Sequence, residues 1–186
     1  MKDKIGVIHG RFQGLHWGHM EYLLAGMKRC EHLFIGITNF DIMEEKPLNE
    51  ANPTRASAES NPFSYYHRYM MIKNSLIEYG VSINQFDIVP FPIEYPDKIK
   101  NYVPVNAKFY VTIYDQWGEK KLSILNSLGY NTEVMWYRTN AERFSSGTQV
   151  RDAIRSGAEW KHLVPNAVYN YIIENDLISI IKGVKS

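Results

Sequence analysis

A strand, a short turn and a helix are predicted in direct succession near the start of the chain, and this unit limits the possible folds most strongly. Ile5, Val7 and Ile8 form a short apolar run with β-branched side chains, which indicates a buried strand. The helix is indicated by apolar residues at helical spacing, namely Met20, Leu23, Leu24 and Met27. Residues 10–19 are therefore expected between the carboxyl end of a strand and the amino end of a helix. Unpaired N–H groups and the helix dipole favour anions there.

Strand and helix patterns alternate along the rest of the chain, which favours a parallel sheet covered by helices. Further strands are expected at residues 33–37, 87–89, 109–113 and 133–136. Further helices are expected from the Asn61-Pro62 pair to about residue 79, over 122–128, over 148–155 and over 165–174. The sequence therefore predicts an α/β fold, a Rossmann-like parallel five-stranded sheet with helices on both faces and C-terminal helices. Ligands of such sheets bind beyond the carboxyl ends of the strands, where the strand order switches.

Composition limits the class of protein. A chain of 186 residues suits a single domain, here 1–186, and 45% hydrophobic with 22% charged residues is typical of a globular protein. A formal charge of +1 argues against nucleic acid or a membrane as partner. The single Cys30 allows no intramolecular disulfide, and no signal peptide or spanning segment is recognisable, so a cytoplasmic location is expected.

The segment Asn39–Asn61 is polar and unusually long for a loop inside a domain. Loops of this length tend to be functional lids or disordered segments, and this one should leave the sheet on the same edge as the turn at 10–19. Its acidic residues Asp41, Glu44 and Glu45 are candidates for water-mediated contact with a metal ion, although a solvated acidic loop is the simpler interpretation.

The turn itself carries two imidazoles and a guanidinium, His16, His19 and Arg11, which indicate a triphosphate ligand. His16 and His19 are three residues apart, so at a helix start they face the same side. Two ordinary surface or capping histidines are the alternative interpretation. A zinc site that adds His9 is disfavoured, because a helix amino terminus repels a dication. No metal site formed by protein ligands is therefore predicted.

Two motifs in this chain resemble those of a known superfamily. Gly10-Arg11-Phe12-Gln13 followed by His16-x-Gly18-His19 resembles the nucleotidylyltransferases, and within them the archaeal-type nicotinamide-mononucleotide adenylyltransferases. Far downstream, Ser146-Gly147-Thr148-Gln149-Val150-Arg151 is similar to the second signature of that family, Ser-(Ser/Gly)-Thr-x-Ile-Arg. Asn61-Pro62-Phe63 with Arg68, and residues 160–165, also look like family segments.

The resemblance implies a reaction that needs donors to phosphate oxygens and no protein nucleophile. The expected catalytic residues are His16, His19, Arg11 and Arg151. Ser146, Gly147 and Thr148 open a helix, where a simple N-cap is the alternative to an anion site, and Arg151 on the same helical face would make it a triphosphate clamp. The expected nucleotide-binding residues are Gly10, Arg11, Phe12, Gln13, Gly18, Ser146, Gly147, Thr148 and Arg151, with the ring of Phe12 packing rather than stacking on a base. Arg138 and Arg143 rank lower.

The acceptor is expected to contact Asn39, Arg68, Asp115, Trp117 and Trp136. The alternatives to acceptor contact are structural roles: a solvated charge for Arg68, a helix cap for Asp115 and core packing for the tryptophans. The chain departs from the adenylyltransferase pattern at three places: Gly14-Leu15, Thr38-Asn39-Phe40-Asp41 and Tyr114-Asp115-Gln116-Trp117. The last two fall where the family would touch nicotinamide mononucleotide.

The leading expectation is transfer of AMP from ATP to nicotinamide mononucleotide, with release of pyrophosphate and formation of NAD. The alternative is a cytidylyltransferase that uses CTP to activate a small phosphate or phosphonate. A non-catalytic nucleotide-sensing module is the alternative from another class, and a dehydrogenase is disfavoured because no Gly-x-Gly-x-x-Gly follows the first strand. The resemblance also implies Mg²⁺ bound with the nucleoside triphosphate, and a homo-oligomer.

Overall fold

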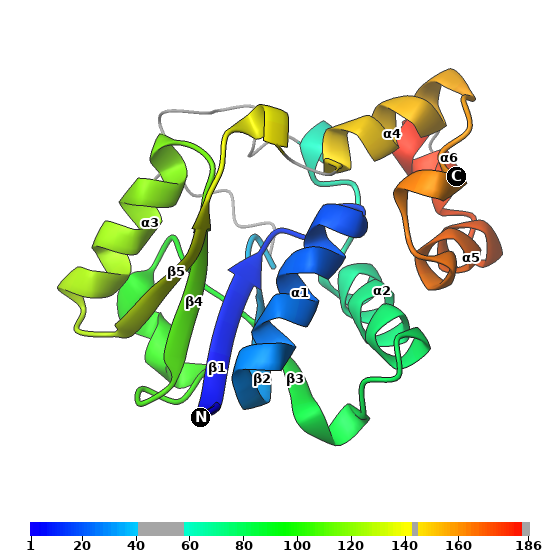
Figure 1. Ribbon diagram of the computed structural model, residues 1–186. Helices are drawn as coiled ribbons and strands as arrows, with labels where there is room; N and C mark the ends of the chain where they lie inside the picture. The colour runs from blue at the N-terminus through cyan, green and yellow to red at the C-terminus, as the bar shows by residue number, and fades with distance from the viewer. Residues whose placement is uncertain (41–57, 143–144, 184–186) are drawn as a thin grey trace.

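A computed structural model describes residues 1–40, 58–142 and 145–183 of the chain. It contains one five-stranded parallel sheet with the order β3-β2-β1-β4-β5 (Figure 1). The strands are β1 (Asp3–Gly10), β2 (Cys30–Ile37), β3 (Phe86–Pro90), β4 (Lys108–Ile113) and β5 (Asn131–Tyr137). The helices are α1 (Trp17–Arg29), α2 (Tyr65–Glu78), α3 (Gln116–Ser127), α4 (Gly147–Ser156), α5 (Asn166–Glu174) and α6 (Leu177–Lys182). The predicted fold class is confirmed.

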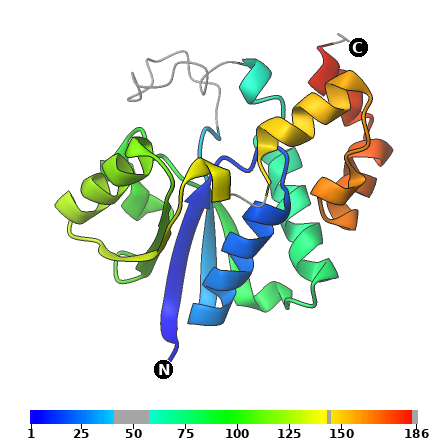
Figure 2. The same ribbon diagram turned by 45° about the horizontal axis from the view of Figure 1, so that its top comes forward.

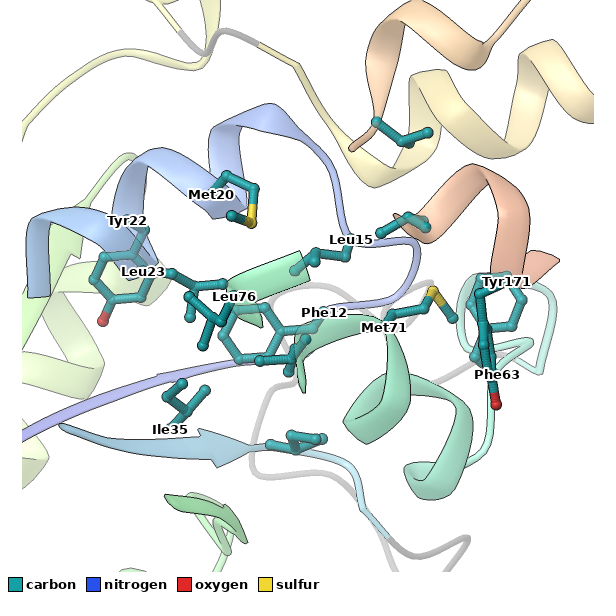
Figure 3. Packing of buried hydrophobic residues seen from close by; sticks show 14 of the residues in the cluster. Phe12, Leu15, Met20, Tyr22, Leu23, Ile35, Phe63, Met71, Leu76 and Tyr171 are labelled. Atoms are coloured by element: carbon teal, nitrogen blue, oxygen red, sulfur yellow. The ribbon is translucent and has the colours of Figure 1, made fainter. Parts of the chain in front are cut away.

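The sheet separates two apolar layers. Successive residues of β1 point to opposite faces, so Ile8 packs in the layer under α1 and α2, whereas Val7 packs in the layer under α3. Figure 3 shows the first layer, where the ring of Phe12 lies close to Leu23 and Leu76. The second layer is closed by Leu125 of α3 and by the 3₁₀ helix Pro96–Asn101. Helices therefore cover both faces, as predicted.

The helix that was predicted to start at Asn61-Pro62 starts later. α2 begins at Tyr65, and Ser64 is its N-cap, with a side chain that accepts a hydrogen bond from His67 N at 3.3 Å. Phe63 lies before the helix because its backbone is held by the side chain of Gln13. The prediction was therefore wrong by one turn at this end, although the end of the helix near residue 79 is confirmed.

The two central strands separate at their carboxyl ends. β1 and β4 pair only at Gly6↔Lys108 and Val7↔Phe109, whereas β1 and β2 stay paired as far as Gly10↔Ile37. Beyond the last β1–β4 pair, the hydroxyl of Tyr22 from α1 bridges the backbones of the two strands in place of direct hydrogen bonds between them. Its oxygen accepts from His9 N at 3.4 Å, and its O–H donates to Tyr110 O at 2.7 Å. The switch in strand order thus lies between these two strands.

The C-terminal helices α4, α5 and α6 pack beside α2 and not on the sheet itself (Figure 2). Val150 and Ile154 of α4, with Val168 and Ile172 of α5, belong to the same apolar layer as α1 and α2. Both views place the amino end of α4 next to the amino end of α1. In the described parts of the chain, no helix has the length and apolar character needed to cross a membrane. The long polar segment Asn39–Asn61, predicted to be a lid or a disordered loop, lies largely outside the described residues.

Candidate functional site

The amino end of α1 brings the two predicted histidines together. His16 is the N-cap, and its carbonyl accepts from the backbone N–H groups of His19 at 2.9 Å and Met20 at 3.0 Å. The imidazole rings of His16 and His19 stack with centroids 3.8 Å apart and planes 30° apart. The prediction that the spacing places both rings on one side of the helix start is confirmed.

Ser145 joins this histidine pair to the start of α4. Its hydroxyl oxygen accepts from Gly18 N at 3.1 Å and is hydrogen-bonded to Nδ1 of His16 at 2.9 Å. The N–H group of Gly18, a predicted nucleotide-binding residue, is therefore already bonded to Ser145. Ser145 was not among the predicted site residues, because it precedes the second motif, which begins at Ser146. The doubled serine before Gly147 was the available signal.

Arg151 forms a second junction between the two helix ends. Its Nη1 donates to the carbonyl of Gln13 at 3.0 Å and its Nη2 to Oγ1 of Thr148 at 3.3 Å. A Cβ atom at Gly147 would lie 2.6 Å from the same Gln13 oxygen, so only glycine allows this approach. Burial lowers the pKa of Arg151, which remains a cation. The two sequence motifs, more than a hundred residues apart, thus meet at one place as predicted.

Ser146 has the simple capping role that was weighed as its alternative. Its Oγ accepts from Gln149 N at 3.2 Å, and Oε1 of Gln149 accepts from Ser146 N at 2.8 Å. This capping box satisfies two groups at the amino end of α4. Contact of Ser146 or Thr148 with a nucleotide stays a prediction.

Two residues of the first motif point into the protein, contrary to their predicted nucleotide contacts. Phe12 has a left-handed backbone (φ 51°) and a fully buried ring, edge-on to His19 at 5.0 Å. The side-chain amide of Gln13 pairs in both directions with the backbone of Phe63, at 3.0 Å each way. An amide that is matched to a peptide group in this way ties the turn to the segment before α2 and is not directed at a ligand. Only the packing role expected for the ring of Phe12 is confirmed.

Arg68 holds the backbone at the edge of the sheet and is not a solvated charge. The side chain is 1% exposed, and burial lowers its pKa to about 10, so it stays charged at neutral pH. Its guanidinium donates to four carbonyls, those of Ser64, Arg11, Thr38 and Asn39, at 2.7–3.2 Å. It thereby fixes the carboxyl ends of β1 and β2 against the start of α2. These contacts correct its predicted role at the acceptor to one of positioning.

The other predicted acceptor residues also have structural contacts. Asp115 caps α3, with Oδ1 accepting from Gly118 N at 2.9 Å, and the backbone of Asn39 is left-handed (φ 48°). Trp136 donates from Nε1 to the hydroxyl of Tyr114 at 2.9 Å, and the guanidinium of Arg138 lies 4.6 Å from its ring centroid. The capping and packing alternatives describe Asp115 and Trp136 better than contact with an acceptor. Trp117 is half-buried, with Nζ of Lys120 5.8 Å from its ring. Arg143 lies outside the described residues.

A cleft of about 640 Å³ opens beyond the carboxyl ends of β4 and β5. Its lining residues are Ile113, Tyr114, Asp115, Gln116, Glu119, Tyr137, Arg138, Thr139 and Glu142. Arg138 makes a two-pronged ion pair with Glu21 of α1 at 2.8 and 2.9 Å, and this pairing raises its pKa. The ion pair ties the cleft to the helix that begins at the histidine pair.

His9 lies on the opposite face of the sheet from the histidine pair. Its ring stacks on Phe91 with centroids 4.6 Å apart and planes 8° apart, and the residue is 5% exposed. Both ring nitrogens are buried with no hydrogen-bond partner among the described residues. Burial, and next the charge of Lys121, hold the pKa of His9 well below its ordinary value, so the ring is neutral. Within the described residues no three potential metal ligands of the His, Cys, Asp or Glu type gather at one place.

Comparison with known proteins gives the family. A family model described as cytidylyltransferase-like matches residues 7–153. The chain belongs to this family. The predicted membership of the nucleotidylyltransferase superfamily is confirmed, as is the enzyme class of nucleotidyltransferase.

This cytidylyltransferase-like chain is 48% identical over 169 residues to a phosphonoformate cytidylyltransferase of Streptomyces viridochromogenes, covering 91% of this chain and 90% of the relative. It is 27% identical over 170 residues to a nicotinamide-nucleotide adenylyltransferase of Saccharolobus solfataricus, again covering 91% and 90%. Of the two substrate alternatives, the cytidylyl alternative is therefore better supported than the leading expectation of NAD synthesis.

Among solved structures, a bifunctional NMN adenylyltransferase/ADP ribose pyrophosphatase of Francisella tularensis, complexed with AMP and a manganese ion, shares the fold. The TM-score is 0.66 at 18% identity, and the match covers 99% of this chain and 52% of that one. The chain thus spans about half the length of this structural neighbour, and the likeness shows the fold alone.

Proposed function

We propose that this chain transfers CMP from CTP to a small phosphonate or phosphate acceptor and releases pyrophosphate. His16, His19 and Arg151 come together where the amino ends of α1 and α4 meet, and this arrangement supports nucleotidyl transfer. The imidazoles offer N–H donors and the guanidinium offers a positive charge, at two helix ends that favour anions. The 48% identity to a phosphonoformate cytidylyltransferase over nearly the whole chain carries the choice of CTP and of a phosphonate.

In this reaction an oxygen of the acceptor attacks the α-phosphorus of CTP. A P–O bond forms between acceptor and CMP, and the bond from the α-phosphorus to the bridging oxygen breaks, so that the electron pair leaves with pyrophosphate. A phosphate monoester has a second pKa of about 6 and is already largely ionised, so the protein needs to supply no base. Its task is to orient the reactants and to stabilise charge on phosphate oxygens.

The hydrogen bonds of Ser145 suggest how His16 is set up for this task. The hydroxyl oxygen of Ser145 accepts the N–H of Gly18, and we assign its proton to the bond with Nδ1 of His16. That assignment makes Nε2 of His16 the N–H donor, because a neutral imidazole carries one proton. His16 and His19 would then donate to the α- and β-phosphoryl oxygens.

We assign the nucleoside to the cleft beyond β4 and β5. The assignment is supported by the position of the cleft at the ligand-binding edge of the sheet and by its ion-paired link to α1. Carboxylates such as Glu119 can accept from the amino group of cytosine or from ribose hydroxyls.

A divalent cation, expected to be Mg²⁺, would arrive with the triphosphate. Mg²⁺ bound with a nucleotide is commonly held mainly by phosphates and water. Its contribution would be to neutralise charge on the phosphates. The predicted contact through Asp41, Glu44 or Glu45 lies outside the described residues. A homo-oligomer and a cytoplasmic location also stay predictions.

The second candidate is the transfer of AMP to nicotinamide mononucleotide, which the 27% identity to an adenylyltransferase favours. The test is a pyrophosphate-release assay with CTP, ATP, GTP and UTP, each against phosphonoformate, methylphosphonate, phosphate and nicotinamide mononucleotide. We expect turnover with CTP and a phosphonate. Turnover with ATP and nicotinamide mononucleotide alone would overturn the proposal. Nucleotide binding without pyrophosphate release from any pair would indicate the sensing module.

A further inference from the structure

His9 is held in a fixed orientation by its neighbours in the sheet. In the register of β1 and β2, His9 lies opposite Gly36. A Cβ atom at Gly36 would lie 2.5 Å from a ring atom of Phe91, so the ring of Phe91 fits here because Gly36 has no side chain. The ring of Phe91 in turn stacks nearly parallel on the imidazole of His9. Such packing fixes the plane of the imidazole before any ligand binds.

The two ring nitrogens of this imidazole have no hydrogen-bond partner in the part of the chain that the structure describes. The surrounding layer is apolar, with Val7, Phe91 and Phe109 as neighbours in one cluster. Buried polar groups in native proteins are usually hydrogen-bonded, and an unpaired one calls for an explanation. An apolar side chain would fill this position without that cost. The two unpartnered nitrogens of His9 therefore point to a ligand that pairs with them.

His9 also lies where a ligand is expected. β1 and β4 stop pairing after Val7 and Phe109, and Tyr22 bridges the strands at the backbone of His9 itself. The position is thus at the switch in strand order, the place where ligands of such sheets bind. Two charged groups belong to this surrounding, Lys121 of α3 and Glu94 after β3. The charge of Lys121 lowers the pKa of His9. Burial raises the pKa of Glu94, and the charge of Lys121 partly offsets this rise.

We propose that His9, together with Lys121, binds a second anionic group of the acceptor, a carboxylate next to the reacting phosphorus. The imidazole N–H donates to a carboxylate oxygen, and the ammonium group of Lys121 supplies the opposite charge. His9 then determines specificity for compact acceptors with two anionic groups. This inference rests on the proposed function and names the acceptor class of the same site.

The test compares two acceptors with CTP: phosphonoformate, which has the carboxylate, and methylphosphonate, which lacks it. His9→Phe keeps a ring to stack on Phe91 but removes both nitrogens, and His9→Gln restores a donor and an acceptor. The matched control is His32→Phe, because His32 is a histidine of the neighbouring strand whose ring is bonded to Asn84 and Asp87.

We expect His9→Phe to lower the ratio of kcat/KM for phosphonoformate to that for methylphosphonate by about 10- to 100-fold, the usual scale for a hydrogen bond to a charged group. The change should come from KM of phosphonoformate and not from KM of CTP. His9→Gln should recover part of the ratio, and His32→Phe should keep it. An equal loss with both acceptors, or an unaltered ratio, would overturn the inference.

A second readout separates this inference from the proposed function. Absence of pyrophosphate release by the wild type with CTP and either phosphonate would refute the proposed function. Calorimetric titration of phosphonoformate into the wild type and His9→Phe then decides about His9. Binding that is lost in the variant supports the inference, and equal or absent binding overturns it. Circular dichroism melts check that each variant is folded.

Discussion

Replacement of Ser145 by alanine tests whether the two helix ends work as one unit. The hydroxyl is 2% exposed and makes two hydrogen bonds, to Gly18 N at 3.1 Å and to Nδ1 of His16 at 2.9 Å. A buried polar group that loses its partner costs about 1–3 kcal/mol. We therefore expect Ser145→Ala to lower the free energy of unfolding by about 2 kcal/mol. For a chain of this size, such a loss lowers Tm by about 4–8 °C.

The same substitution should reduce turnover, because His16 loses the bond that selects its tautomer. A net contribution of about 0.5–1.5 kcal/mol for that bond corresponds to a decrease in kcat of about 3- to 10-fold. Thermal melts and pyrophosphate release with CTP and phosphonoformate measure the two effects. Ser156→Ala is the control, since Ser156 is exposed and bonds only to the last turn of α4. Wild-type Tm and kcat in Ser145→Ala would refute the proposed junction.

Three further predictions concern single residues. His19→Ala should lower kcat by about 10²–10³ with an unchanged melt, the usual effect of removing one transition-state donor, and a near-normal rate in the assay would exclude that role. Arg68→Ala should lower the free energy of unfolding by about 3 kcal/mol, because four carbonyls lose their donor. At about 2–4 °C per kcal/mol, this loss lowers Tm by about 6–12 °C. A Tm within about 1–2 °C of wild type would contradict the positioning role. Burial holds the pKa of His9, and less strongly that of His67, below the ordinary value of 6.5, so the stability present above pH 6.5 should be lost as the pH falls through the lowered pKa values. Urea unfolding at pH 7.5 and 5.5 measures this loss, which His9→Phe should reduce.

The sheet was predictable because its strands are short apolar runs with clear breaks between them. The two helix starts that carry the motifs were predictable as well. The start of α1 combines a turn with two histidines at helical spacing, and the start of α4 combines a capping serine with an arginine on the same helical face. Spacing along one helix also gave the shared side of His16 and His19. These signals are local, so they can be recognised in the sequence without the tertiary structure.

The direction of side chains in the turn was not predictable in the same way. Gln13 and Arg68 are polar residues in a motif region, and their type alone favours a ligand contact. In the structure the side chain of Gln13 pairs with the backbone of Phe63, fifty residues away. The guanidinium of Arg68 donates to backbone carbonyls on three separate segments of the chain. Which carbonyls need a donor depends on how loops pass one another, and no local pattern encodes it. Ser145 differs from both, because the doubled serine before Gly147 was a local signal.

The hydrogen bonds at the helix ends are made within the protein, so the donors are arranged without help from a ligand. Binding energy then need not be spent on assembling the site, and donors that are already oriented are the ones that stabilise developing charge best. The histidine pair is at the amino end of α1, whereas His9 is on the face of β1 covered by α3. If the nucleotide phosphates occupy the first place and the acceptor the second, the acceptor oxygen attacks one side of the α-phosphorus and pyrophosphate leaves from the opposite side. An in-line displacement needs this arrangement. The separation of β1 from β4 by Tyr22 would then serve the reaction directly, because it opens the sheet at the point where the acceptor has to enter.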